Sequence, residues 1–145
     1  MRQLFTPKAV AVVALASAAV VAACSSSSND NSCGSGTPPD LDGDWALRSY
    51  TVGTTTIPAP PASGELRIHS SNNTYYFTAT LPGPTTVVDS GTYTQTGQTC
   101  LSQSSVLGNP QFVGTYTTNG SPIDSLVVQG SAGGQTLANG WRLIP

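Results

Sequence analysis

Side chains able to do chemistry are few in this chain of 145 residues, which has one histidine, three cysteines and seven acidic residues. The histidine, His69, could act as a general base, but catalysis also needs a nucleophile or a second acid–base group held beside it. His69 alternates out of phase with Leu66 and Ile68, which predicts a solvent-facing side chain beside Arg67. Neither G-x-S-x-G nor H-E-x-x-H occurs in the sequence. We therefore predict no catalytic residues and expect a protein that is not an enzyme.

Three aspartates at alternate positions, Asp40, Asp42 and Asp44, invite comparison with a calcium loop. An EF-hand loop needs glycine at its sixth position and glutamate at its twelfth, where counting from Asp40 finds Trp45 and Thr51. The sequence therefore predicts a solvated acidic segment, with no metal site and no cofactor.

The composition excludes several classes of protein. Charged residues make up 8% of the chain, against about 25% in average soluble domains. Beyond residue 24 there are three arginines, no lysine and all seven acidic residues, so no basic patch is available to bind nucleic acid. The scarcity of Glu, Lys and Arg also argues against a coiled coil.

The first 23 residues have the pattern of an export signal. Residues 1–8 carry two positive charges and no acid, and residues 9–23 are an unbroken run of Ala, Val, Leu and one Ser. That run is shorter than the roughly 20 residues of a membrane-spanning helix, whereas a signal peptide needs an apolar stretch of about 7–15. We predict a signal helix that is cleaved, with an uncleaved membrane anchor as the alternative.

The residues at the end of this run indicate a lipid modification. Val21, Ala22 and Ala23 precede Cys24, and this resembles the lipobox of bacterial lipoproteins. The resemblance implies a diacylglycerol group on the Cys24 thiol and a protein anchored by lipid to a membrane of the bacterial cell envelope. Two or three acyl chains would satisfy the requirement of stable anchoring for more than one chain. Ordinary secretion with a free Cys24 thiol is the alternative.

With Cys24 assigned to lipid, Cys33 and Cys100 remain. Export implies an oxidising compartment, where two leftover cysteines usually pair. We expect a Cys33–Cys100 disulfide, with two free thiols as the alternative. Residues 25–40 contain no aliphatic or aromatic side chain, so segment 24–40 is predicted to be a flexible tether.

Residues 41–145 are rich in strand-forming residues and are divided by Pro and Gly every 8–15 residues. Eight short strands at such spacing predict an all-β fold, a small antiparallel up-and-down barrel. The predicted strands are 45–52, 65–69, 74–81, 85–95, 99–103, 112–118, 123–129 and 135–144.

The opening of this region, Leu-Asp-Gly-Asp-Trp-Ala-Leu at residues 41–47, resembles the G-x-W signature of the lipocalin-like (calycin) barrels. In that family the tryptophan packs at the closed end of the barrel under a basic side chain of the last strand. The resemblance implies that Gly43, Trp45 and Arg142 close the barrel, with a cation–π contact between Trp45 and Arg142. The chain departs from the family in lacking a T-D-Y element and a helix after the last strand.

Two functions are expected of such a barrel. The first is binding of a small apolar ligand, and the second is a protein-interaction barrel, an inhibitor or envelope assembly factor, that uses loops 57–61 and 107–111. A hydrolase is a third, weaker alternative. An open apolar interior of about 300 Å³ or more would favour the ligand, and a filled interior with apolar loops would favour the partner. The predicted ligand-lining residues are Leu66, Ile68, Phe77, Tyr93, Phe112 and Tyr116.

Overall fold

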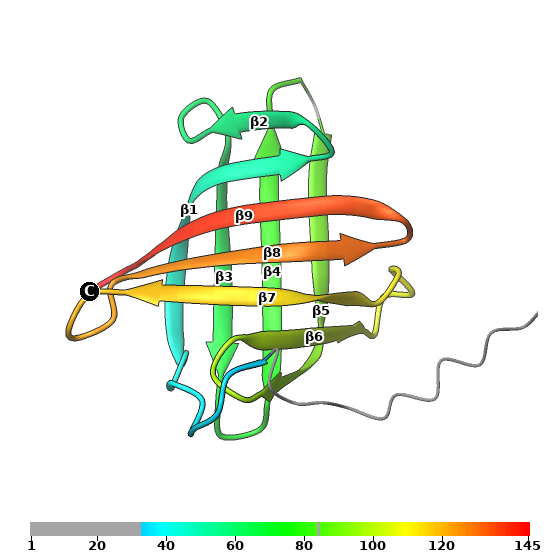
Figure 1. Cartoon of the computed structure of the whole chain (residues 1–145). Helices are drawn as coiled ribbons and strands as arrows, with labels where there is room; N and C mark the ends of the chain where they lie inside the picture. Colours follow the sequence, from blue (N-terminus) through cyan, green and yellow to red (C-terminus); the bar gives the residue numbers. More distant parts are fainter. Residues whose placement is uncertain (1–32, 84) are drawn as a thin grey trace, which may run out of the picture.

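The computed structural model of the chain describes residues 33–83 and 85–145, which contain no α-helix. Their nine strands succeed one another along the chain from β1 to β9 (Figure 1). The predicted signal helix lies outside the described residues. The strands are β1 (Gly43–Val52), β2 (Thr55–Pro58), β3 (Ser63–His69), β4 (Thr74–Leu81), β5 (Thr85–Thr96), β6 (Cys100–Ser105), β7 (Phe112–Asn119), β8 (Ser125–Ala132) and β9 (Gln135–Leu143).

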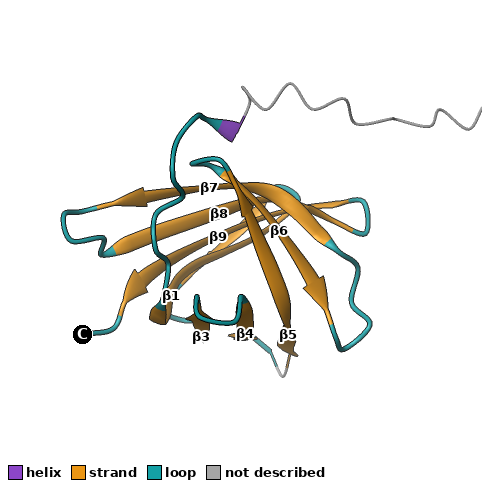
Figure 2. Ribbon diagram, turned by 90° about the horizontal axis from the view of Figure 1, so that it is seen from below, coloured by secondary structure: helices purple, strands orange, loops and turns teal. Residues whose placement is uncertain are grey.

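All strand pairs are antiparallel, and from β3 to β9 each strand pairs with the next one in the chain. Pairing of β1 with both β3 and β9 closes the sheet into an eight-stranded barrel, and β2 is an additional short strand beside the second half of β1. The barrel is flattened into two layers. Figure 2 shows β3, β4 and β5 below, crossing β7, β8 and β9 above at a steep angle.

A bulge in β1 lets this strand serve both layers. Residues 43–46 pair with β3 and residues 49–52 pair with β2, and the register against β9 shifts between Leu47 and Ser49. The extra residue is Arg48. Since a bulge bends its strand and increases the local twist, β1 can turn here from the direction of one layer toward that of the other.

The all-β barrel and all eight predicted strands are confirmed, with boundaries that differ by no more than three residues. The prediction missed β2, which lies in the proline-rich stretch interpreted as a loop. A proline is compatible with the end of an edge strand, because no partner needs its missing N–H there. Pro58 is the last residue of β2, and the other residues of that strand pair with Thr51, Val52 and Tyr50.

The strand directions define two ends of the barrel. Segment 33–42, the turns 70–73, 97–99 and 120–124, and the C-terminus lie at one end, which we call the closed end (lower left in Figure 1). The remaining described connections, around residues 53–62, 82–83, 106–111 and 133–134, lie at the opposite end, which we call the mouth end. The core fills the closed end with buried side chains, chiefly Leu41, Trp45, Ile68, Tyr93, Tyr116 and Leu126, each no more than 4% exposed.

Candidate functional site

A cavity of about 340 Å³ occupies the barrel interior toward the mouth end. Exposed residues of the mouth-end loops, Asn109, Pro110 and Gly133, belong to its wall, so the cavity reaches solvent there. No residue of the closed-end turns lines it. The residues around it are Tyr50, Val52, Leu66, Tyr75, Phe77, Val87, Asp89, Gln103, Asn109, Pro110, Phe112, Val128, Ala132, Gly133, Gln135, Leu137, Asn139 and Trp141.

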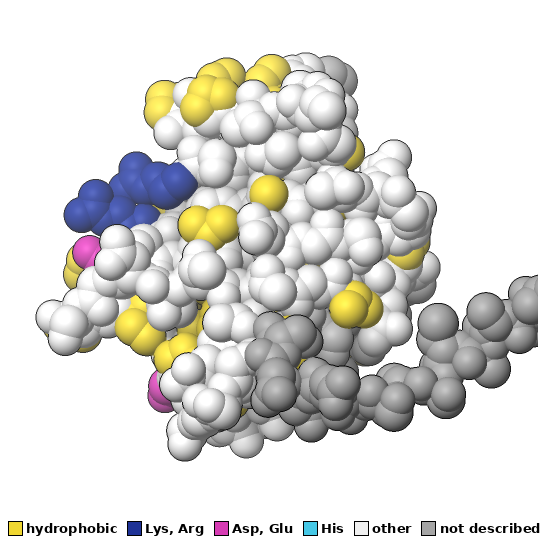
Figure 3. Space-filling model, viewed as in Figure 1, with side chains coloured by type: hydrophobic (Ala, Val, Ile, Leu, Met, Phe, Trp, Pro, Cys, Tyr) yellow, Lys and Arg dark blue, Asp and Glu magenta, His cyan; other side chains and the backbone are white. Residues whose placement is uncertain are grey.

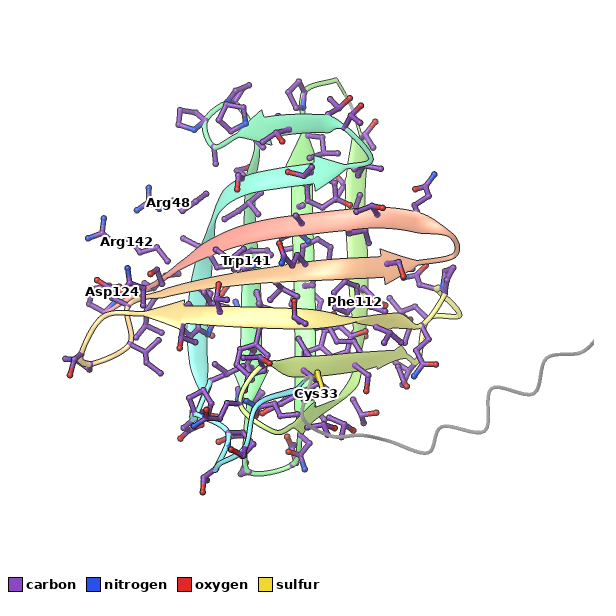
Figure 4. All side chains as sticks on the ribbon, in the orientation of Figure 1. Cys33, Arg48, Phe112, Asp124, Trp141 and Arg142 are labelled. Carbon is purple, nitrogen blue, oxygen red and sulfur yellow. A yellow bond between two sulfur atoms is a disulfide. The ribbon has the colours of Figure 1, made fainter. Side chains whose placement is uncertain are left out.

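Three aromatic rings from three strands form the floor of the cavity. Tyr50 of β1 stacks on Phe77 of β4, with ring centroids 6.3 Å apart and planes 9° from parallel. Trp141 of β9 meets Phe77 edge to face, with centroids 5.6 Å apart at 86°. Such pairs hold their rings in defined orientations and present a large apolar surface. Figure 4 shows where Trp141 and another lining aromatic, Phe112, extend from β9 and β7.

Asp89 of β5 places a carboxylate in this apolar wall. Its Oδ2 accepts a hydrogen bond from the Tyr75 hydroxyl at 2.7 Å. Its Oδ1 accepts from the Asn109 amide and from the Ser90 backbone N–H, each at 2.9 Å, and from the Ser105 hydroxyl. Burial is the main cause that raises the pKa of Tyr75, and the hydrogen bond to Asp89 and the charge of Asp89 raise it further. The Tyr75 hydroxyl therefore stays protonated and acts as the hydrogen-bond donor to the carboxylate.

The same network fixes the β6–β7 loop over one side of the mouth. The Ser105 hydroxyl also accepts from the Leu107 and Asn109 backbone N–H groups, at 3.0 and 3.3 Å. The Asn109 amide donates to the Val88 carbonyl at 3.2 Å. Asp89 is thus both a wall residue and the anchor of this loop.

A second polar group in the wall is Asn139 of β9, one of two residues in the described structure with a buried side-chain oxygen or nitrogen that has no hydrogen-bond partner. The unpartnered atom is Oδ1, an acceptor. The other residue is Tyr93, whose hydroxyl is buried at the closed end, away from the cavity.

Comparisons of the chain with protein-family models, with curated proteins and with solved structures found no match. The function therefore has to be argued from the geometry of the barrel, which is consistent with a lipocalin-like fold.

Half of the predicted ligand-lining residues surround the cavity. Leu66, Phe77 and Phe112 do, whereas Ile68, Tyr93 and Tyr116 do not. All six point inward, but the last three lie nearer the closed end, where they are at most 4% exposed and fill the core. The prediction was wrong for these three because strand alternation identifies the inner face and not the depth along the barrel.

Of the three residues expected to close the barrel, Gly43 and Trp45 lie at the closed end at the start of β1, and Arg142 is an exposed residue of β9. Trp45 is 1% exposed, and its indole N–H donates to the Leu41 carbonyl at 3.1 Å. Gly43 has a φ of 137°, and a Cβ there would lie 2.8 Å from Leu143 Cδ1, so the start of β1 requires glycine.

The expected contact between Trp45 and Arg142 is absent, and this corrects the prediction. Trp45 pairs with Leu143, and Arg142 pairs with Ala46. Neighbouring residues of a strand point to opposite faces, so Arg142 lies on the outer face, where it is exposed. Figure 4 shows it beside Arg48, and the two form the dark blue patch at one edge of Figure 3.

The predicted Cys33–Cys100 disulfide is present, with a Cα–Cα distance of 5.0 Å. The Thr99 N–H donates to the Cys33 carbonyl at 3.0 Å, and the Gln95 amide donates to the Pro39 carbonyl at 3.0 Å. Residues 33–40 therefore lie against the closed end, and the prediction of a flexible tether through residue 40 is wrong for them. Signal segment 1–23 and Cys24 lie outside the described residues.

The other candidate residues have structural surroundings. His69 is exposed at the end of β3, as its alternation predicts. Asp42 accepts from the Ser70 N–H at 2.8 Å, and Asp44 lies 3.8 Å from Arg67, which binds Glu65 at 2.7 Å. Within residues 33–83 and 85–145, no three His, Cys, Asp or Glu residues gather in a metal-binding group. In this part of the chain there is no helix long and apolar enough to span a membrane.

The polar residues in the wall of the cavity were not predicted from the sequence. Asp89 shares its alternation with Val87, Gly91 and Tyr93, so an acidic residue at an inward position was visible in the sequence. Asn139 likewise occupies an inward position of β9, in the same alternation as Leu137 and Trp141. Polar residues in phase with an apolar face are the signal that would have identified both.

Proposed function

We propose that the chain is an exported, lipid-anchored protein of the bacterial cell envelope whose barrel binds a small apolar ligand. The observation that carries the ligand-binding part is the cavity of about 340 Å³ with an aromatic floor and a solvent-reaching mouth. Ligand pockets are concave, mostly apolar and about 300–1,000 Å³ in volume, with a few polar groups that orient the ligand. Asp89 is such a group.

The proposal assigns no catalytic role. His69 is exposed on the outer face. The neighbours of Asp89 are hydrogen-bond donors that hold it in place, namely the side chains of Tyr75, Ser105 and Asn109 and the backbone N–H of Ser90. A carboxylate held by four donors is suited to binding.

Support for the envelope location comes from the sequence of residues 1–24, with its charged start, apolar run and lipobox-like Cys24. A disulfide at the closed end agrees with export to an oxidising compartment. Cys24→Ser, in the full chain expressed in a bacterium that lipidates its exported proteins, is expected to move the protein from the membrane to the soluble fraction. Unchanged membrane fractionation would instead identify the apolar run as the anchor.

Ligand binding is tested with a neutral fluorescent apolar probe, N-phenyl-1-naphthylamine, titrated into the purified domain. Val128 is 7% exposed and lines the cavity, whereas its neighbour Val127 is 42% exposed on the outer face. Val128→Phe is expected to weaken probe binding at least tenfold, and Val127→Phe to leave it within twofold. Equal affinity of both variants and the native protein, or no binding to the native protein, would contradict the proposal.

The β6–β7 loop supports the alternative of a protein-interaction barrel. Val106 is 72% exposed and Leu107 56%, in the loop that covers one side of the mouth. In this alternative, Val106→Ser with Leu107→Ser abolishes the association with an envelope partner and leaves probe binding intact.

A further inference from the structure

We propose that the cavity takes a small organic cation, an apolar body carrying a protonated amine, with Asp89 as its counter-charge. This inference rests on the proposed ligand-binding function and specifies the chemical class of the ligand.

The charge of the cavity is the first observation. Among the described residues that line it, Asp89 is the only charged one. The cationic side chains in the described part of the chain lie elsewhere: Arg48 and Arg142 are exposed together on the outer face (Figure 4), and Arg67 binds Glu65. Asp89 is therefore held by neutral donors and not by an ion pair. A negative charge in an apolar wall favours a positively charged occupant and disfavours an anion such as a fatty acid.

The second observation is the unused hydrogen-bonding capacity of the wall. Asp89 Oδ1 already accepts three hydrogen bonds, whereas Oδ2 accepts one, from Tyr75. An oxygen that accepts a single hydrogen bond has room for a second donor, so Oδ2 can accept one from a ligand. Asn139 also lines the cavity, but its Oδ1 is fully buried and does not face the open space. Asp89 Oδ2 is therefore the acceptor that calls for an N–H or O–H donor on the ligand.

The third observation is the aromatic floor beside the carboxylate. Phe77 pairs directly across from Asp89 in the β4–β5 ladder and stacks on Tyr50. A cation over the face of an aromatic ring is attracted by the ring electrostatically, and most strongly when the cation is desolvated. Carboxylate and rings thus favour the same charge, and the remaining apolar wall is available for the body of the ligand.

Asp89 also anchors the β6–β7 loop, so the test must separate charge from loop structure. Asp89→Asn removes the charge and keeps the shape of the side chain. Asp44→Asn removes the same charge from the outer face and is the matched control.

The probes are phenylbutylamine, phenylbutanol and phenylbutanoate, which differ in one terminal group, titrated at pH 7 by calorimetry. We expect the amine to bind the native domain at least tenfold more tightly than the alcohol, and the carboxylate more weakly than the alcohol. The amine preference is expected to fall to within twofold in Asp89→Asn and to persist in Asp44→Asn. N-phenyl-1-naphthylamine binding by Asp89→Asn verifies that its cavity is intact.

An alcohol that binds the native domain as tightly as the amine, or an amine preference that survives Asp89→Asn, would overturn the inference. If N-phenyl-1-naphthylamine still binds in that case, the proposed apolar-ligand function stands and only the amine class falls. If the native domain binds none of the four compounds, both proposals fail.

Discussion

The two ends of this barrel are built from the same strands and differ in how their interior is filled. At the closed end the inward residues are large, and Trp45, Tyr116 and Leu126 are each 1% exposed. At the mouth end several inward positions hold smaller or polar residues, such as Val52, Asp89 and Ala132, and a cavity of about 340 Å³ remains there. A barrel of eight strands has an interior just wide enough to be filled by side chains or to hold one small ligand. Here one end is filled and the other is hollow.

The ends also differ in how their connections are fixed. The closed end has a disulfide, and segment 33–40 is hydrogen-bonded to the barrel through Gln95 and Thr99. The mouth end has the hydrogen bonds of Asp89 to the β6–β7 loop. A covalent link at one end and a few exchangeable hydrogen bonds at the other indicate that stability resides mainly at the closed end and adaptability at the mouth.

The largest effect that this comparison predicts is that of Trp45→Ala. Removal of a fully buried tryptophan is expected to lower the free energy of unfolding by about 3–5 kcal/mol. Leu137→Ala, in the cavity wall, is expected to cost less than half as much, because Leu137 is only partly buried and already borders a void. Urea denaturation of both variants measures the difference. A Trp45→Ala loss below about 1 kcal/mol would contradict the assignment of stability to the closed end.

Removal of the disulfide is expected to have a somewhat smaller effect. Cys33→Ser with Cys100→Ser opens a link between residues 67 apart, which should lower the free energy of unfolding by about 2–4 kcal/mol. Because the link lies at the closed end, the affinity for N-phenyl-1-naphthylamine should stay within twofold of the native value. A tenfold loss of probe affinity in the folded double variant would show that the two ends are coupled.

Much of the fold was predictable because its signals are local. Alternation placed Leu66 and Ile68 inside and His69 outside, and Gly and Pro marked the ends of the strands. The strand β2 was missed because Pro58, Pro60 and Pro61 indicate a loop. Its pairing depends on the second half of β1, which is free to accept it only because β1 bends at Arg48.

The site was less predictable because it depends on register and depth. Phe77, Tyr93 and Tyr116 share an inward orientation, yet only Phe77 borders the cavity. Which side chains meet is decided by the pairing of distant strands, as with Phe77 and Trp141. The same limit explains the error at Arg142, since a shift of one residue in the β1–β9 register exchanges the inner and outer faces.

The interior tyrosines provide the mildest test of the comparison, through alkaline pH. Burial raises the pKa of Tyr93 and Tyr116 at the closed end and of Tyr50 and Tyr75 in the cavity wall. Above about pH 10 the unfolded chain loses phenolic protons that the folded chain retains, so the free energy of unfolding should fall as pH rises.

Tyr93→Phe separates one of these contributions from the others. The Tyr93 hydroxyl is buried without a hydrogen-bond partner in the described structure, so its removal should leave stability at pH 7 unchanged or raise it by up to about 1–3 kcal/mol. Tyr93→Phe should also make the decrease in the free energy of unfolding between pH 9 and 11 less steep. Tyr76→Phe, which removes an exposed phenol from the outer face, is the control. Its free energy of unfolding should decrease with pH as steeply as that of the native protein. Urea melts at pH 7, 9 and 11 measure all three proteins. If Tyr93→Phe is destabilised by more than about 1 kcal/mol at pH 7, the hydroxyl has a partner, and the closed end is held by more than the packing of its side chains.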